Sequence, residues 1–260
     1  MYNFEFVKPS SVADAVSALS SNGAQALGGG QTLIPTMKQR LASPDTLVSL
    51  VGIAEMQGVK SSAGNVTIGG ATTHQAVAAA DVFAGLTTLA GNIGDPAVRN
   101  RGTIGGSLAN NDPAACYPAA VLATGATITT NSRDIAADDY FQGMFTTALE
   151  EGEIITAVTM QVPEVSNYQK FEQPASRFAL VGVFVAKYAD GVRVGVTGAS
   201  ENGAFRWSEA EVALSANFSA DVIADLSLDA TDMMEDLHGS KAYRVNLVKV
   251  LTGRAVVSAS

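Results

Sequence analysis

Two glycine-rich stretches of the sequence have the residues needed to bind a phosphate-bearing ligand through the protein backbone. The first glycine stretch, residues 26–35, reads ALGGGQTLIP and places three consecutive glycines after a short apolar run. Glycine tolerates positive φ and lets a ligand approach the main chain, and Gln31 and Thr32 add polar donors before an expected helix. Taken alone, this stretch fits a tight connection between a strand and a helix equally well.

The second glycine stretch, residues 99–120, reads RNRGTIGGSLANNDPAACYPAA and repeats the pattern. Its glycines and hydrogen-bonding residues are Gly102, Thr103, Gly105, Gly106, Ser107, Asn110 and Asn111. Two such stretches in different parts of the chain predict one ligand with an extended, phosphate-bearing middle held between them. The first stretch reads GGGQTL rather than GxGxxG, which disfavours a dinucleotide site of the Rossmann type.

Asp112 lies inside the second glycine stretch and has two possible roles. Asp112-Pro113 has the order of an N-cap followed by proline at the first helical position, and it predicts a helix through Val121 or Leu122. A carboxylate beside the glycines could also order the ligand-binding segment. Both roles are compatible with the sequence.

Side chains that could perform acid–base, nucleophilic or metal chemistry are scarce. His74 opens an expected helix, where a capping or packing role is favoured, and His238 precedes a glycine at an expected helix end. Cys116 has no partner cysteine and no adjacent Lys or Arg, so we expect a small buried thiol. The sequence contains neither HExxH nor CxxC, and we predict no catalytic residue and no metal ligand. The chemistry is therefore expected to come from a bound cofactor.

The residues that position the first glycine stretch form a small βαβαβ pattern over residues 1–56. Strands are expected at 4–7, 24–27 and 46–50, with helices from Val12 to Leu19 and over 33–41. The glycines then follow the carboxyl end of a strand, where open α/β sheets generally bind ligands.

Two further domains are expected. Residues 57–165 predict a mixed α/β subdomain with strands at 65–70, 126–130 and 154–161, helices at 73–80 and 83–90, a connecting segment at 140–145, and a linker at 163–167. Residues 166–260 predict antiparallel strands at 178–188 and 192–199, then helices at 209–214, within 222–237, and at 243–256. The expected class is α+β: a two-part ligand-binding region followed by a C-terminal α+β domain.

Composition limits the partners of this chain. It has 260 residues, 47% hydrophobic and 16% charged, which is typical of a compact globular protein. The formal net charge of -9 argues against a nucleic-acid or anionic-membrane surface. A single cysteine excludes an internal disulfide and an iron–sulfur cluster ligated by this chain alone. No apolar run is long enough to span a membrane and the N-terminus lacks a signal-peptide pattern, so we expect a cytoplasmic protein.

The two glycine stretches together resemble the FAD-binding medium subunit of aerobic molybdenum hydroxylases, the group of carbon monoxide dehydrogenase and xanthine dehydrogenase. The similarity extends through Asp95-Pro96, residues 168–183 and residues 243–256, and so covers nearly the whole chain. It implies FAD, with the diphosphate between residues 29–33 and 103–107. One departure is Cys116, which stands where many members have an aspartate near the adenosine half of the cofactor.

The resemblance implies a set of cofactor-binding residues. They are Gly28, Gly29, Gly30, Gln31, Thr32, Leu33, Gly102, Thr103, Ile104, Gly105, Gly106, Ser107, Asn110, Asp112, Cys116, Tyr168, Phe178 and Leu180. It further implies that residues 168–180 lie over the isoalloxazine, with Phe178 or Tyr168 against the ring. An aromatic residue in a strand also commonly packs in a core.

The function implied by the resemblance is electron transfer. A large partner subunit would carry the molybdenum cofactor and a small one [2Fe–2S] clusters, in a dimer of heterotrimers that passes electrons through FAD to an external acceptor. The carbon monoxide dehydrogenase type is expected first, and an aldehyde or N-heterocycle dehydrogenase is the alternative. A self-contained FAD-dependent oxidoreductase of the related fold and a nucleotide-binding interaction module are further alternatives. The last helix, with Arg244, Lys249 and Arg254, is expected to contribute to a mixed interface patch.

Overall fold

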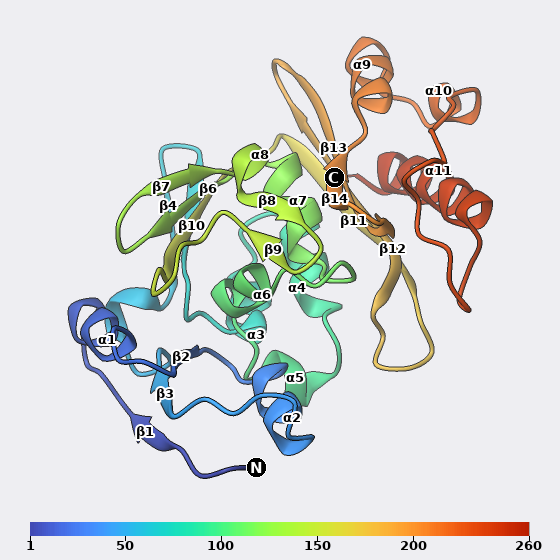
Figure 1. Cartoon of the computed structure of the whole chain (residues 1–260). Helices are drawn as coiled ribbons and strands as arrows, with labels where there is room; N and C mark the ends of the chain where they lie inside the picture. Colours follow the sequence, from blue (N-terminus) through green and yellow to red (C-terminus); the bar gives the residue numbers. More distant parts are fainter. Residues whose placement is uncertain (260) are drawn as a thin grey trace.

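The structure, a computed structural model, describes residues 1–259. Helices and strands are mixed along the chain, and the strands group into separate sheets that each draw on one part of the sequence (Figure 1). The α+β class expected from the sequence is confirmed. Across residues 1–259, none of the helices has the length and apolarity to cross a membrane.

The first sheet is parallel and has the strand order β1-β3-β2. Its elements are β1 (Glu5–Val7), α1 (Val12–Leu19), β2 (Ala24–Leu27), α2 (Leu33–Lys38) and β3 (Thr46–Ser49). The Ser11 hydroxyl caps α1 by accepting the Asp14 N–H at 3.1 Å. Ala15 of this helix packs on Val48 in the sheet. The first glycine stretch leaves the sheet at the carboxyl end of β2.

The second sheet is antiparallel and has the order β4-β5-β10-β6-β7, with β10 in the centre. Its unit contains η1 (Ala54–Met56), β4 (Val59–Ser62), β5 (Asn65–Gly69), α3 (His74–Ala80), α4 (Ala84–Gly91), α5 (Pro96–Arg99), α6 (Ile104–Asn110), α7 (Tyr117–Ala123), β6 (Thr127–Thr130), β7 (Asp134–Ala136) and β10 (Ile155–Gln161). The connecting segment expected at 140–145 lies within α8 (Ala137–Tyr140) and the hairpin of β8 (Phe141–Gly143) and β9 (Thr146–Thr147).

The expected helix from Asp112 through Val121 is wrong in its start. Asp112 does not cap a helix; its Oδ1 accepts the Ala114 N–H at 2.8 Å in a local turn, and α7 begins only at Tyr117. The physical reason lies in the third sheet, where the Gly198 N–H donates to the Pro113 carbonyl at 2.8 Å. The Pro113 carbonyl oxygen is therefore hydrogen-bonded to the third sheet and not to a helical N–H.

The third sheet is antiparallel and follows the chain order β11-β12-β13-β14. Its elements are β11 (Val165–Glu172), β12 (Ala179–Tyr188), β13 (Gly191–Ser200), β14 (Gly203–Arg206), α9 (Ser208–Ala216), α10 (Asp221–Ala224) and α11 (Lys241–Ser258). In Figure 1, α9, α10 and α11 lie on the side of this sheet that faces away from α4 and α7. Leu247 and Leu251 of α11 share a buried cluster with Val183 of the sheet.

Two expected boundaries in the C-terminal part are also wrong. The proposed linker at 163–167 overlaps β11, which starts at Val165. The helix expected within 222–237 is only the short α10, and His238 lies in a turn rather than at a helix end. Aspartates compete with helical hydrogen bonding here, since Asp229 accepts the Thr231 N–H at 2.9 Å and Asp236 the His238 N–H at 2.9 Å.

Arg244 of α11 is buried, 2% exposed, and does not belong to the surface patch that the sequence suggested. Its Nη1 donates to the Leu180 and Gly198 carbonyl oxygens at 2.8 and 2.6 Å. Its Nη2 donates to Asp236 at 2.8 Å. The guanidinium thus ties α11 to β12, to β13 and to the loop that precedes α11.

We predict that Arg244→Ala lowers the free energy of unfolding by roughly 2–4 kcal/mol, because two buried carbonyl groups and a carboxylate lose their donor. Arg254→Ala is the matched control, since Arg254 is exposed on the same helix and such changes cost at most about 0.5 kcal/mol. Urea unfolding of both variants measures the difference. Equal midpoints for the two variants would contradict a structural role for Arg244.

Candidate functional site

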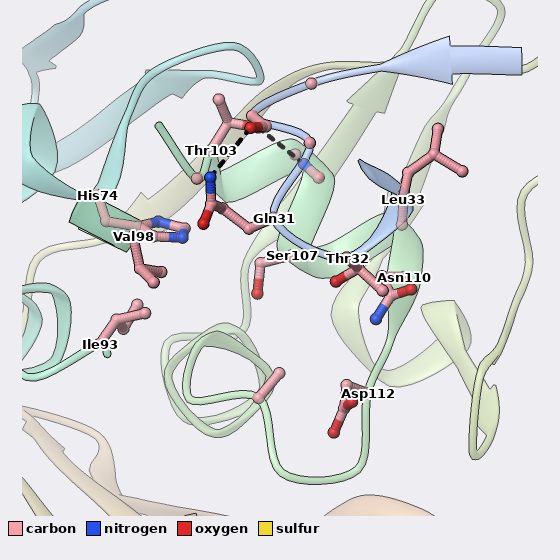
Figure 2. A pocket seen from close by; sticks show the side chains of 18 of the residues that line it. Gln31, Thr32, Leu33, His74, Ile93, Val98, Thr103, Ser107, Asn110 and Asp112 are labelled. Carbon is pink, nitrogen blue, oxygen red and sulfur yellow. Dashed lines mark hydrogen bonds between the residues drawn. The ribbon is translucent and has the colours of Figure 1, made fainter. Parts of the chain in front are cut away.

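A cavity of about 780 Å³ brings the two glycine stretches together. Its size is in the usual range for small-molecule sites, about 300–1,000 Å³. Of the residues indicated by the sequence, those that line it are Gly28, Gly29, Gly30, Gln31, Thr32, Leu33, Gly102, Thr103, Gly105, Gly106, Ser107, Asn110, Asp112, Cys116 and Phe178. Figure 2 shows Thr32 on one stretch and Ser107 and Asn110 on the other within this cavity.

The glycines allow the two stretches to touch backbone to backbone. A Cβ atom on Gly29 would lie 1.9 Å from the Arg101 carbonyl oxygen and 2.5 Å from the Gly102 Cα. A Cβ on Gly102 would in turn lie 2.5 Å from Nε2 of His74. Both distances are shorter than any real Cβ contact, so Gly29 and Gly102 are required by the contact between chain segments. This role adds to the ligand approach for which these glycines were singled out.

Gly106 has a different environment. It is exposed, it lines the cavity, and a Cβ there would meet only the Thr103 Oγ1, at 3.0 Å. Thr103 caps α6 by accepting the Gly106 N–H at 3.1 Å (Figure 2). The space above Gly106 is therefore open toward the cavity.

The first glycine stretch, which lines the same cavity, has backbone donors without a protein acceptor. Across residues 1–259, no protein acceptor binds the backbone N–H groups of Gly29, Gly30, Gln31 or Thr32. Gly30 has a φ of 71°, a conformation that suits glycine, and the Gln31 side chain donates back to the Gly29 carbonyl at 3.3 Å (Figure 2). Successive free N–H groups of this kind bind anionic oxygens well.

The second glycine stretch is held in place by the segment before α3. The His74 N–H donates to the Gly102 carbonyl at 2.9 Å, and the Gly105 N–H donates to the Gly70 carbonyl at 2.9 Å. Thr73 and Thr103 form a β-bridge between the two segments. This part of the cavity wall is thus fixed by main-chain hydrogen bonds.

His74 is itself part of this wall, as a neutral residue. The cap of α3 is Thr73, and the His74 ring is buried with its centroid 5.3 Å from that of Tyr117. Burial, and then the charge of Arg99, lower the pKa of His74 to about 4. Among residues 1–259, the His74 Nδ1 has no hydrogen-bond partner. Of the two roles open in the sequence, packing is the one that the structure shows.

Lys170 of β11 lines the cavity and was not indicated by the sequence. Its side chain is 2% exposed, and Nζ donates to the Asn92 and Arg177 carbonyl oxygens at 2.5 and 2.9 Å. Glu172 lies 3.6 Å away. No local pattern marks it, because period-two alternation puts Lys170 on the same side of β11 as Tyr168, which packs in the core. Lys170 brings a positive charge to the wall formed by the third sheet.

Three residues suggested by the resemblance do not line the cavity. They are Ile104, Tyr168 and Leu180. Ile104 and Tyr168 belong to the core under the second sheet, and Leu180 to the core under α11. Phe178, half-exposed, is the aromatic residue of that segment that reaches the cavity. The alternation of β11 turns Tyr168 inward, toward Phe184.

The thiol on the cavity wall is not activated as a nucleophile. Cys116 is buried, and burial raises the pKa of its thiol. Within residues 1–259, His, Cys, Asp and Glu side chains form no cluster of three or more that could hold a metal ion. The site can bind an extended anionic ligand and hold it beside a cation and an aromatic ring.

Known proteins share this fold and this chain length. Residues 2–164 match the family described as the FAD binding domain in molybdopterin dehydrogenase. The chain is 32% identical to the carbon monoxide dehydrogenase medium chain of Afipia carboxidovorans, over 98% of this chain and 96% of the relative. It is also 32% identical to the glyceraldehyde dehydrogenase medium chain of Sulfolobus acidocaldarius, over 97% and 96%. The reconstituted CO dehydrogenase from Oligotropha carboxidovorans matches in structure with a TM-score of 0.86 and 30% identity, over 98% and 97%.

We predict that acidification destabilises the protein through His74. The folded-state pKa of about 4 lies below the ordinary 6.5, so between these values the unfolded chain binds a proton that the folded chain does not. The contribution of neutral His74 to the free energy of unfolding is complete above pH 6.5. It is lost as the pH falls toward 4, by up to about 3 kcal/mol.

Thermal unfolding of the wild type and of His74→Gln between pH 7 and pH 4.5 measures this effect. The variant should lose less stability over that window, whatever its stability at pH 7. Glu153 titrates below this pH window, because its pKa is lowered to about 2 chiefly by the hydrogen bond from Arg133. Parallel curves for the two proteins would show that His74 is not the group responsible.

Proposed function

The chain belongs to the FAD-binding medium subunits of molybdenum hydroxylases, and from that premise we propose that it serves a complex of the carbon monoxide dehydrogenase type. As a member, it is the FAD-carrying subunit of an oxidoreductase whose partner subunits carry the molybdenum cofactor and [2Fe–2S] clusters. FAD supplies the redox chemistry that links those clusters to an external acceptor. The residues of this chain bind and orient it.

The assignment of the cofactor site rests on one observation: the two glycine stretches line a single cavity and leave a space between them, called the cradle below. Residues 29–32, whose N–H groups have no protein acceptor among the described residues, line the same cavity as the open space at Gly106. A diphosphate needs such donors and such space, and Ser107 and Asn110 add hydrogen-bonding side chains. In this proposal Thr103, as the cap of α6, keeps the second stretch in position.

The remaining cavity residues receive the two ends of the cofactor. We assign Phe178 to the flavin ring, with Lys170 as the nearby cation, because both lie on the wall formed by the third sheet. Asp112 and Cys116 complete the wall between the second glycine stretch and α7. Tyr168, Ile104 and Leu180 support that wall from the cores behind it.

The domain assignment is part of the same proposal. Residues 1–56 and 57–165 form the two halves of the cofactor site, and residues 166–260 close it and face the partners. The complex is a dimer of heterotrimers. The substrate is oxidised at the molybdenum centre of another chain, which agrees with the neutral His74 and the protonated Cys116 at this site.

An aldehyde dehydrogenase complex is the second candidate function. The medium chains of carbon monoxide dehydrogenase and glyceraldehyde dehydrogenase are equally similar to this chain, at 32% identity each. Oxidation of carbon monoxide or of an aldehyde by the purified complex distinguishes the two candidates.

The assignment is tested by purifying the tagged chain from its native host. We predict that a large and a small partner co-elute and that acid precipitation releases FAD into the supernatant. The cofactor is not covalently bound, because a thiol with a raised pKa is a poor nucleophile. A stable monomer that oxidises an organic substrate without partners, or colour that stays in the acid pellet, would contradict it.

We predict that Gly106→Val weakens FAD binding at least about tenfold, because the branched side chain fills the space offered to the diphosphate. Gly91→Val is the matched control, since a Cβ on Gly91 meets nothing within 4 Å. Gly30→Val should also lose flavin, but its φ of 71° adds backbone strain. Flavin absorbance per protein and fluorescence titration with FAD measure the effect. Full flavin content in Gly106→Val would refute the proposal that the diphosphate binds in the cradle at Gly106.

A further inference from the structure

Lys170 of β11 places a buried ammonium group between two turns that line the cavity. Its side chain is 2% exposed, and Nζ donates to the Asn92 carbonyl at 2.5 Å and to the Arg177 carbonyl at 2.9 Å. Asn92 caps the C-terminus of α4 and is followed by cavity residues 93–94, and Arg177 directly precedes Phe178. The ammonium group therefore lies at the end of the cavity to which the flavin ring is assigned.

Both turns have further hydrogen bonds of their own. Nη1 of Arg99 donates to the carbonyl oxygens of residues 93–94 at 3.2 and 2.9 Å, which fixes the turn after α4. The Gln173 N–H donates to the Phe178 carbonyl at 2.8 Å and closes the turn between β11 and β12. Lys170 is thus not the sole support of either turn, and its distinct contribution to the cavity is its charge.

The charge of Lys170 is only partly offset by a carboxylate. Glu172 lies 3.6 Å from Nζ, but its side chain is 40% exposed, so solvent screens it more strongly than the buried cation. Burial raises the pKa of the Cys116 thiol, which lines the cavity, and Lys170 lowers that pKa by more than Glu172 raises it. Arg177, a second cation of this wall, is exposed and therefore screened. The field of the Lys170–Glu172 pair at the cavity wall is thus positive.

The carboxylates on the cavity wall do not cancel this positive field. Glu153 is paired with Arg133, whose Nε and Nη2 each donate to one of its carboxylate oxygens at 3.0 Å. Figure 2 shows Asp112 across the cavity from Ile93, which belongs to the turn bound by Lys170. At the flavin end of the cavity, Lys170 is therefore a buried positive charge without an equal counter-charge.

We propose that the charge of Lys170 raises the reduction potential of the flavin bound in the cavity. Reduction by two electrons and one proton, FAD + 2e⁻ + H⁺ → FADH⁻, adds one negative charge to the ring. A buried cation on the wall that holds the ring stabilises this charge and favours the reduced form. The electrons are those supplied by the [2Fe–2S] clusters of the proposed complex, and the proton comes from water. This inference rests on the function proposed above and deepens its assignment of the flavin end.

The test compares Lys170→Met with Lys170→Arg in the full chain loaded with FAD. Methionine gives a side chain of similar length without the charge, so the affinity for reduced FAD should fall relative to that for oxidised FAD by at least about tenfold. For a two-electron couple this lowers the midpoint potential by about 30 mV. Lys170→Arg keeps the charge and should stay within about threefold of the wild-type affinity ratio. Reductive titration of the flavin absorbance against a reference dye at constant pH gives the midpoint.

A second variant, Glu172→Gln, tests the same inference with the opposite sign. Glu172 lies outside the cavity lining and its side chain is 40% exposed, so this substitution leaves the wall intact and removes the offsetting charge. The ratio of the affinity for reduced FAD to that for oxidised FAD should rise at least about twofold. Lys187→Met is the matched control, because Lys187 of β12 lies over Phe218, 5.1 Å from the ring centroid, and outside the cavity lining. Its affinity ratio should equal that of the wild type.

The outcomes separate this inference from the proposed function. A purely structural role of Lys170 would change the affinity for both oxidation states of FAD equally, so an unchanged ratio in Lys170→Met overturns the inference and leaves the proposed function standing. An equal shift in Lys187→Met overturns it as well. Should Lys170→Met retain no FAD, Glu172→Gln decides: a higher ratio supports the inference, and an unchanged or lower one overturns it. A wild-type chain that binds no FAD would remove the proposed function, and this inference with it.

Discussion

The direct contact between the two glycine stretches is the constraint on which the site depends. Gly29 lies against the Arg101–Gly102 peptide, and Gly102 lies against the His74 ring, at distances that leave no room for a Cβ. Because backbone meets backbone, the donors of residues 29–32 are held opposite α6 without intervening side chains. Any side chain there would separate the parallel first sheet from the antiparallel second one and open the cavity between them.

The third sheet depends on the second glycine stretch in turn. The Thr197 hydroxyl donates to the Ala115 carbonyl at 2.7 Å, and the Gly198 N–H donates to the Pro113 carbonyl at 2.8 Å. Arg244 then fixes Gly198 to α11. The same sheet supplies Lys170, so the segment that closes the cavity also places a cation on its wall. Stability of the C-terminal unit and geometry of the site are therefore coupled through a few buried polar contacts.

The chemistry of the wall agrees with a chain that carries a cofactor and performs no proton transfer of its own. His74 is held neutral and the Cys116 thiol is held protonated, in both cases chiefly by burial. The backbone amides, hydroxyls and carboxamides at the cavity bind and orient a ligand without titrating near neutral pH. Function then lies in where the cofactor is held and in which partner can approach it.

The sequence by itself determined the fold class, the βαβαβ start and the two glycine stretches, because hydrophobic periodicity and glycine are local signals. It also indicated Thr103, Ser107 and Phe178, which line the cavity. Tertiary structure alone decided that Lys170 reaches the cavity, that Arg244 is buried and that Asp112 caps no helix. Each of these follows from partners far away in the chain: the Asn92 carbonyl for Lys170, the Leu180 and Gly198 carbonyls for Arg244, and the third sheet for the segment after Asp112. A local pattern carries no information about such partners, since they are brought together only when the sheets pack.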